Sequence, residues 1–167
     1  MDDGQSAAED VYADICADLD YPMVVVTASD GPRRSGCLVG FSSQCSLEPP
    51  LLMVWVSRDN HTHDVALAAT HLGVHFLSHS ERPIGVLFGS LTGDSVDKFA
   101  RIRWRPAADG TPVLEGCARW VVGRVVARHA TGDHTGFLLS PVEGECRAWD
   151  GQLSFSDVSD VRPGHPK

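Results

Sequence analysis

Two polar segments of this chain carry side chains that can hold an anionic or hydroxylated ligand, and one apolar run separates them. The first segment is residues 40–46, of sequence GFSSQCS, and the second is residues 57–62, of sequence SRDNHT. Hydroxyls, amides and backbone N–H groups are neutral donors suited to a phosphate or a polyol. The run 51–56 between them predicts a strand that is buried on both faces. We therefore expect both segments to line one cavity beside this strand.

The candidate binding residues are the small, hydroxyl, amide and basic members of these segments, together with one aromatic residue. They are Gly40, Phe41, Ser42, Ser43, Ser57, Arg58, Asn60, His61 and Thr62. A glycine lets a ligand approach the backbone closely. A helix is expected to begin at Thr62, and helix N-termini bind phosphate well. Two structural alternatives stay open, namely a serine-rich turn before a strand and a plain N-cap at Thr62.

Composition restricts the class of protein. The 167 residues fit one domain, and the net charge of −8 argues against a broad nucleic-acid surface. No apolar run is long enough to span a membrane, and the acidic start lacks the features of a signal peptide. We therefore expect a cytoplasmic protein.

Cysteine and histidine spacing gives no sign of a metal site or of a disulfide framework. The five cysteines are odd in number, and none of them forms a C-x-x-C pair. Buried free thiols are expected instead. His61 and His63 form an H-x-H pair, but spacing supplies no third ligand.

Hydrophobic periodicity predicts the elements that position the polar segments. A helix is expected over 6–19, where Ser6 and Glu9 have capping-box spacing. The further elements expected in the first half are strands at 23–28, 36–41, 51–56 and 73–78 and helices at 62–70 and 82–88.

The second half is expected to be rich in strands. The ranges are a short turn or helix at 96–100, strands at 112–115, 118–128, 137–142 and 146–153, and a turn at 132–136. Pro141 marks a bulge or a sheet edge. The tail, residues 154–167, contains two prolines and is expected to be loosely held.

These elements predict a mainly β, α+β fold, an antiparallel barrel with helical inserts. The expected organisation is an N-terminal helix (1–20), a barrel domain (21–153) and a C-terminal tail (154–167). Neither a dinucleotide-binding glycine motif nor a Walker A motif occurs.

Several short motifs occur in order along the chain. They are PMVVVT at 22–27, SLEPP at 46–50, THD at 62–64, VHFLS at 74–78, DKF at 97–99, PVLEG at 112–116 and GDHT at 132–135. Between Tyr21 and Gly151 the chain resembles the flavin reductase-like family, whose fold is the FMN-binding split barrel. It departs from the family pattern at Gly40, at His75 and over residues 136–140.

The resemblance implies a homodimer that binds FMN or FAD near the subunit interface. It implies reduction of that flavin by NADH or NADPH, often to supply a partner monooxygenase. In this view Ser42 and Ser43 contact the flavin, Phe88 packs near its dimethylbenzene ring, and His134 is the catalytic candidate beside the nicotinamide. The alternatives are a core position for Phe88, a structural turn role for His134, and core or interface positions for Trp55, Trp104 and Trp120.

Three functional classes are considered. The first is an NAD(P)H-dependent flavin reductase. The second is an FMN-binding flavoprotein that does not use a nicotinamide nucleotide. The third is a split barrel that binds another cofactor, such as heme or a deazaflavin. A visible spectrum separates the third class, and anaerobic NADH consumption separates the first two.

Overall fold

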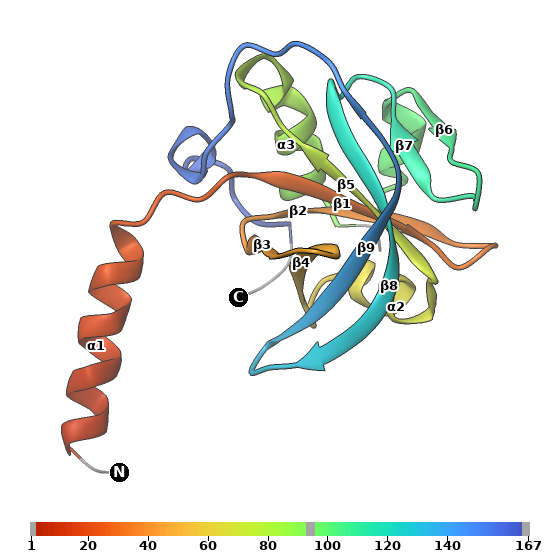
Figure 1. Cartoon of the computed structure of the whole chain (residues 1–167). Helices are drawn as coiled ribbons and strands as arrows, with labels where there is room; N and C mark the ends of the chain where they lie inside the picture. Colours follow the sequence, from red (N-terminus) through yellow and green to blue (C-terminus); the bar gives the residue numbers. More distant parts are fainter. Residues whose placement is uncertain (1–2, 93–95, 165–167) are drawn as a thin grey trace.

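The body of the molecule is a seven-stranded antiparallel sheet in the order β2-β1-β5-β8-β9-β4-β3 (Figure 1). The computed structural model describes residues 3–92 and 96–164. The strands of the large sheet are β1 (Val24–Ser29), β2 (Arg34–Val39), β3 (Ser42–Leu47), β4 (Pro50–Ser57), β5 (His71–Phe76), β8 (Arg119–Ala130) and β9 (His134–Cys146). Strands β6 (Trp104–Pro106) and β7 (Pro112–Leu114) form a separate pair.

The described residues also form three α-helices and three short 3₁₀ helices. They are α1 (Asp3–Ala17), α2 (His61–Ala68), α3 (Arg82–Ser90), η1 (His79–Glu81), η2 (Lys98–Arg101) and η3 (Phe155–Val158). The sheet curls so that β2 and β4, near its two ends, approach each other (Figure 1). The expected antiparallel barrel with helical inserts is thereby confirmed, and β1 and β2 form an antiparallel hairpin within it.

Two apolar clusters lie on opposite faces of the curled sheet. One fills the barrel and includes Val24, Val26, Val54 and Phe137 together with side chains of α2. The other lies outside the barrel, where α3, η2, β7 and the C-terminal segment cover the sheet. Strand β1 is therefore buried on both faces, because its alternate side chains enter different clusters.

Strand β4 is not buried on both faces, contrary to the expectation from its unbroken apolar sequence. Val54 and Val56 are fully buried inside the barrel, whereas Met53 and Trp55 are only partly buried. No core layer covers the outer face of β4 at Trp55, and this side chain lines a cavity instead.

Several boundaries differ from the expectation. The segment 42–47 forms edge strand β3, and 104–106 forms β6, neither of which was expected. Residues 147–153 do not close the sheet, because β9 ends at Cys146 and only isolated bridges follow. Pro141 does lie at a bulge, where the register between β8 and β9 shifts.

The helices also differ at their ends. Helix α1 begins at Asp3, so Ser6 lies within it instead of capping it. Helix α2 begins at His61, and its N-cap is Asn60 instead of Thr62. Helix α1 extends away from the body of the molecule (Figure 1), and its apolar residues Val11, Tyr12 and Ile15 are exposed.

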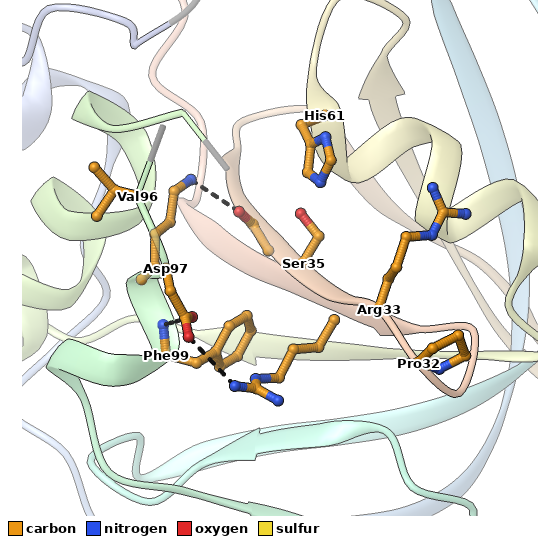
Figure 2. A pocket seen from close by; sticks show the side chains of 10 residues that line it. Pro32, Arg33, Ser35, His61, Val96, Asp97 and Phe99 are labelled. Atoms are coloured by element: carbon orange, nitrogen blue, oxygen red, sulfur yellow. Dashed lines mark hydrogen bonds and ion pairs between the residues drawn. The ribbon is translucent and has the colours of Figure 1, made fainter. Parts of the chain in front are cut away.

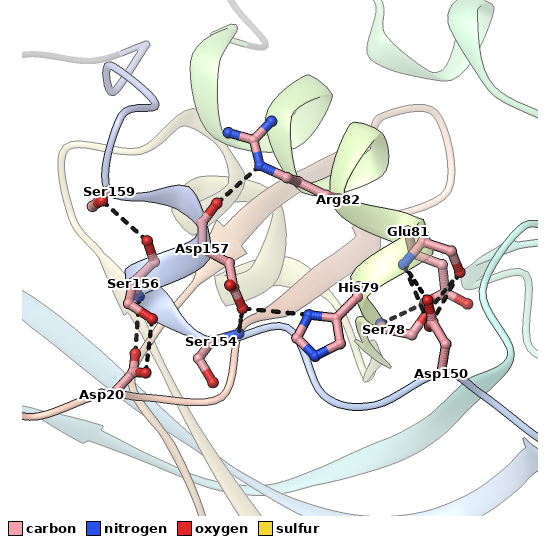
Figure 3. A network of polar contacts seen from close by, with 11 residues as sticks. Asp20, Ser78, His79, Glu81, Arg82, Asp150, Ser154, Ser156, Asp157 and Ser159 are labelled. Carbon is pink, nitrogen blue, oxygen red and sulfur yellow. Dashed lines mark hydrogen bonds and ion pairs between the residues drawn. The ribbon is translucent and has the colours of Figure 1, made fainter.

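The beginning of the C-terminal tail is held by polar contacts, so the expectation of a loose tail is wrong there (Figure 3). The Arg82 guanidinium donates to the Asp157 carbonyl at 2.9 Å. The Ser156 hydroxyl donates to the Asp20 carboxylate at 2.8 Å, and Val158 is buried. Residues 1–2 of the expected N-terminal segment and 165–167 of the tail lie outside the described residues.

The cysteines are free thiols, as expected, but not all are buried. Cys37 and Cys117 are buried, Cys16 is partly exposed, and Cys45 and Cys146 are exposed. The exposed pair lies on edge strand β3 and at the end of β9. Among the described residues, no helix is long and apolar enough to cross a membrane.

A fully buried histidine, His75, joins three strands. Its Nδ1 lies 3.1 Å from the Val25 carbonyl of β1, and its Nε2 accepts the Leu114 N–H of β7 at 3.0 Å. Because Nε2 accepts, the proton of the neutral ring is on Nδ1, which donates to Val25. Burial lowers the pKa of His75 to about 4.

The depressed pKa predicts a stability that depends on pH. The folded protein holds His75 neutral down to a pKa of about 4, whereas the unfolded chain protonates it near 6.5. Stability from this group is therefore complete above pH 6.5 and declines as the pH falls toward 4, by about 3 kcal/mol in total. We expect His75→Asn to flatten the dependence of urea unfolding on pH between these values. The exposed control His129→Asn should leave the slope as in the wild type, and an unchanged slope in His75→Asn would contradict the assignment.

Candidate functional site

The first candidate site is a cavity of about 540 Å³ at the C-terminal end of β2, here called the aromatic cavity. The end of β2, the link from β2 to β3, the outer face of β4 and the turn before β9 contribute to its walls. Five of the predicted residues line it, namely Gly40, Phe41, Ser57, Asn60 and His134. The volume lies within the range of small-molecule sites.

Aromatic side chains from distant parts of the sequence meet around this cavity. The rings of Tyr21 and Phe41 are 5.9 Å apart, those of Tyr21 and Phe155 are 6.2 Å apart, and those of Phe41 and His134 are 5.1 Å apart. Tyr21, Trp55 and Phe155 were not among the predicted site residues. No local motif marks them, because only the folded chain brings them to Phe41.

A second cavity of about 470 Å³ lies at the other end of β2 and is here called the basic cavity (Figure 2). Its lining includes Arg33, Arg34, Ser35, His61 and Lys98. The Arg34 guanidinium lies 4.9 Å from the centre of the Trp104 ring and 3.3 Å from an Asp97 carboxylate oxygen. Basic side chains thus gather where β2 meets α2 and η2, an arrangement suited to an anion, although Asp97 also lines this cavity and Asp30 pairs with Arg33.

The N-terminus of α2 lies between the two cavities. The Asn60 side chain accepts the Thr62 N–H at 3.0 Å, and the Thr62 hydroxyl shares a hydrogen bond of 2.9 Å with Ser35 of β2. Thr62 is buried, so its hydroxyl holds α2 against β2. Asn60 lines the aromatic cavity, and His61 lines the basic one.

The structure does not bring every predicted residue to these cavities. Ser42 and Ser43 line a separate cavity of about 400 Å³, so the expectation that both polar segments share one cavity is wrong for them. After Phe41 the chain enters β3, and the course of this strand places the two serines away from α2. Arg58 directs its guanidinium to the Thr131 carbonyl at 3.3 Å.

Phe88 belongs to the core instead of a ligand-facing wall. Its side chain is 1% exposed, and its ring packs 5.6 Å from the ring of Phe99. A side chain buried to this degree cannot contact a ligand in the aromatic cavity. The core alternative for Phe88 is therefore the correct one.

His134 is both a turn residue and a cavity residue. Its Nδ1 lies 2.6 Å from the Asp133 carboxylate, and this hydrogen bond lowers the pKa of Asp133. Donation from Nδ1 to the carboxylate leaves Nε2 as the ring nitrogen that can meet a ligand. The geometry therefore agrees with the turn alternative, and the role of His134 beside the nicotinamide stays a prediction.

Two buried side chains near the cavities have shifted pKa values. Burial raises the pKa of the Cys37 thiol to about 11, so this side chain is neutral at pH 7. Burial lowers the pKa of Lys98, whose Nζ donates to the carbonyls of Gly36 at 2.9 Å and Phe88 at 3.0 Å. In residues 3–92 and 96–164, no three His, Cys, Asp or Glu side chains gather as a metal site requires.

Comparison with known proteins identifies the family to which this chain belongs. The model of the flavin reductase like domain matches residues 17–157, which include all of the residues that line the basic cavity and most of those that line the aromatic cavity. The chain belongs to this family. The matched residues therefore include the whole sheet and most of η3.

Curated relatives and solved structures agree with this assignment. The chain is 33% identical over 129 residues to the reductase subunit HsaB of a flavin-dependent monooxygenase from Mycobacterium tuberculosis, covering 75% of this chain and 62% of the relative. It is 33% identical over 126 residues to the FMN reductase (NADH) RutF of Variovorax paradoxus, covering 74% and 68%. It thus spans about three fifths of the length of the first of these relatives.

The same fold occurs in the NADH:FAD oxidoreductase SgcE6 of Streptomyces globisporus C-1027. The TM-score is 0.74 at 23% sequence identity, and the match covers 84% of this chain and 82% of that chain. The family's split barrel is therefore the fold of this chain.

Lys98 is expected to stabilise the wall between β2 and α3. Its ammonium is the donor for two carbonyls that lie on different elements. In Lys98→Met both carbonyls lose this partner, which should reduce the free energy of unfolding by about 2 kcal/mol. Urea unfolding measures the change, with the exposed Arg101→Met on the same 3₁₀ helix as a control. Equal stabilities of the two variants would show that these hydrogen bonds contribute nothing.

Proposed function

We propose that this flavin reductase-like domain binds FMN or FAD and reduces it with NADH or NADPH. The observation that carries the proposal is the pairing of the aromatic cavity with the basic cavity along β2. A flavin nucleotide carries matching groups at its two ends, since a planar ring is joined through a hydroxylated chain to a phosphate. The names of the relatives HsaB and RutF point in the same direction.

The proposed orientation places the flavin ring in the aromatic cavity and the phosphate in the basic cavity. The backbone at Gly40 and Phe41 and the side chains of Ser57 and Asn60 would face the ring and the hydroxylated chain. Arg33, Arg34 and His61 would face the phosphate, beside the N-terminus of α2. This set keeps five of the predicted binding residues and adds the two arginines.

A flavin held in this way would supply the redox chemistry, namely the capacity to take up a hydride from a nicotinamide nucleotide. The protein contributes binding, orientation and exclusion of water. His134 is proposed to position the nicotinamide nucleotide, since its Nε2 is left for a ligand by the bond from Nδ1 to Asp133. The neutral thiol of Cys37 takes no part as a nucleophile.

We also propose the cytoplasm as the location and a flavin-dependent monooxygenase as the acceptor of the reduced flavin. Free thiols are typical of a reducing compartment. HsaB is named as the reductase subunit of such a monooxygenase.

A second copy of the chain is the proposed partner of α1. Val11 and Ile15 are 59% and 55% exposed on a helix that extends from the body. Residues 1–20 contain seven acidic side chains and no basic one. Two such helices side by side would repel each other, so α1 is proposed to dock on the body of the partner.

The proposed reaction is tested through His134. Purified protein with added FMN or FAD should consume NADH without oxygen, and the visible spectrum should show flavin reduction. His134→Ala should raise the KM for NADH roughly tenfold to a hundredfold, because about 1–3 kcal/mol of binding is lost. The affinity for flavin should remain nearly unchanged, and His129→Ala serves as a control.

Two results would count against this proposal. Flavin binding without NADH or NADPH consumption would favour the flavoprotein that does not use a nicotinamide nucleotide. Wild-type kinetics in His134→Ala would show that His134 has only a structural role in its turn.

The proposed dimer is tested by light scattering at micromolar concentration. The wild type should have the mass of two chains, and Val11→Asp with Ile15→Asp should shift it toward one chain, since charge is placed on the apolar face. Asp10→Asn on another face of α1 is the matched control. A wild-type monomer with flavin bound would overturn the proposal.

A further inference from the structure

Trp55 occupies an unusual place for a large aromatic residue on a barrel strand. Its neighbours Val54 and Val56 enter the barrel core, whereas Trp55 points to the other face of β4. There it lines the aromatic cavity and also an adjoining cavity of about 680 Å³. The indole therefore stands where two cavities meet.

A glycine opposite Trp55 makes room for the indole. Gly136 of β9 pairs directly with Trp55 across the sheet. A Cβ atom at Gly136 would lie 2.9 Å from the indole Nε1 and 3.2 Å from Cδ1, closer than packed atoms normally come. Any larger residue at 136 would force the indole to move. Trp55 and Gly136 thus act as a pair.

The indole offers a ligand both a flat face and a hydrogen-bond donor. The Trp55 side chain makes no hydrogen bond within the described part of the chain, and its Nε1 is not among the buried polar atoms, so this N–H is available to a ligand. Tyr21, Phe41 and His134 line the same two cavities. Such a group of rings suits a planar heteroaromatic ligand.

We infer that Trp55 is a positioning residue for the flavin ring, and that Gly136 holds the indole in the place from which it contacts that ring. The inference rests on the proposed function and deepens it, because it assigns the ring end of the site to a residue outside the polar segments. Trp55 contacts only the ring, whereas the residues of the basic cavity at the far end of β2 contact the phosphate.

Binding of riboflavin and of FMN distinguishes the ring end of the site from its phosphate end, because riboflavin lacks the phosphate. Trp55→Ala should weaken both ligands by the same factor, about tenfold or more, as loss of a stacking aromatic does elsewhere. Trp55→Phe should recover most of the affinity. Arg34→Gln should weaken FMN and leave riboflavin nearly unchanged. Titration calorimetry gives the dissociation constants, and thermal unfolding checks that each variant is folded.

Tryptophan fluorescence provides a readout that a merely structural role would not give. FMN and riboflavin should quench the emission of Trp55 in the wild type, and Trp55→Phe should remove most of that quenching. The matched control is Trp149→Phe, whose indole packs 4.0 Å from the Arg119 guanidinium. Quenching in this control should remain near the wild-type level.

The pairing with Gly136 is tested by a double-variant cycle. Gly136→Ala should weaken riboflavin in the wild-type background, because its Cβ displaces the indole. In the Trp55→Ala background the same change should have little further effect.

The outcomes separate this inference from the proposed function. A wild type that binds neither FMN nor riboflavin would overturn the proposed function and this inference with it. A wild type that binds both, with unchanged affinity in Trp55→Ala and full quenching in Trp55→Phe, would overturn the inference alone. Unequal losses of FMN and riboflavin in Trp55→Ala would also overturn it, since the contact would then not be with the ring.

Discussion

Strand β2 has a sheet neighbour on one edge only, and the candidate site depends on how its other edge is satisfied. Lys98 donates to the Gly36 carbonyl, and Ser35 shares a hydrogen bond with Thr62 of α2. A free strand edge otherwise exposes polar backbone groups that attract other chains. Because side chains close this edge in place of another strand, α2 and η2 are brought against β2. The basic cavity forms where these three elements meet.

The strands rich in β-branched residues could be predicted because runs of such residues indicate a buried strand. The three consecutive valines of β1 are an example, since both of its faces are covered. Strand β3 was missed because its side chains are mostly exposed, so no apolar alternation marks it. Strand β4 was misjudged for the opposite reason. Its partly exposed Trp55 faces a cavity, and an apolar sequence does not distinguish a cavity wall from a core.

The candidate site was predictable only where its residues are close in sequence. Gly40 and Phe41 lie in one polar segment, Ser57 and Asn60 lie in the other, and the turn containing His134 is itself a motif. Lys98 lay within the DKF motif, yet its burial and its two carbonyl partners follow from the approach of α3 to β2. The serines at 42 and 43 show the converse. A hydroxyl-rich pattern gives the type of chemistry, but the direction of β3 decides which cavity receives it.

The walls of the aromatic cavity come from both ends of the domain. Ala13 and Tyr21 lie near its start and Phe155 near its end, and the Phe155 N–H donates to the Tyr21 carbonyl at 2.8 Å. Contacts between residues so far apart in sequence form late in folding, because a long loop must first be closed. During synthesis the ribosome releases Tyr21 long before Phe155. A nascent chain can therefore assemble much of its barrel while this cavity still lacks one wall, and the site becomes complete only when the segment that contains Phe155 has left the ribosome.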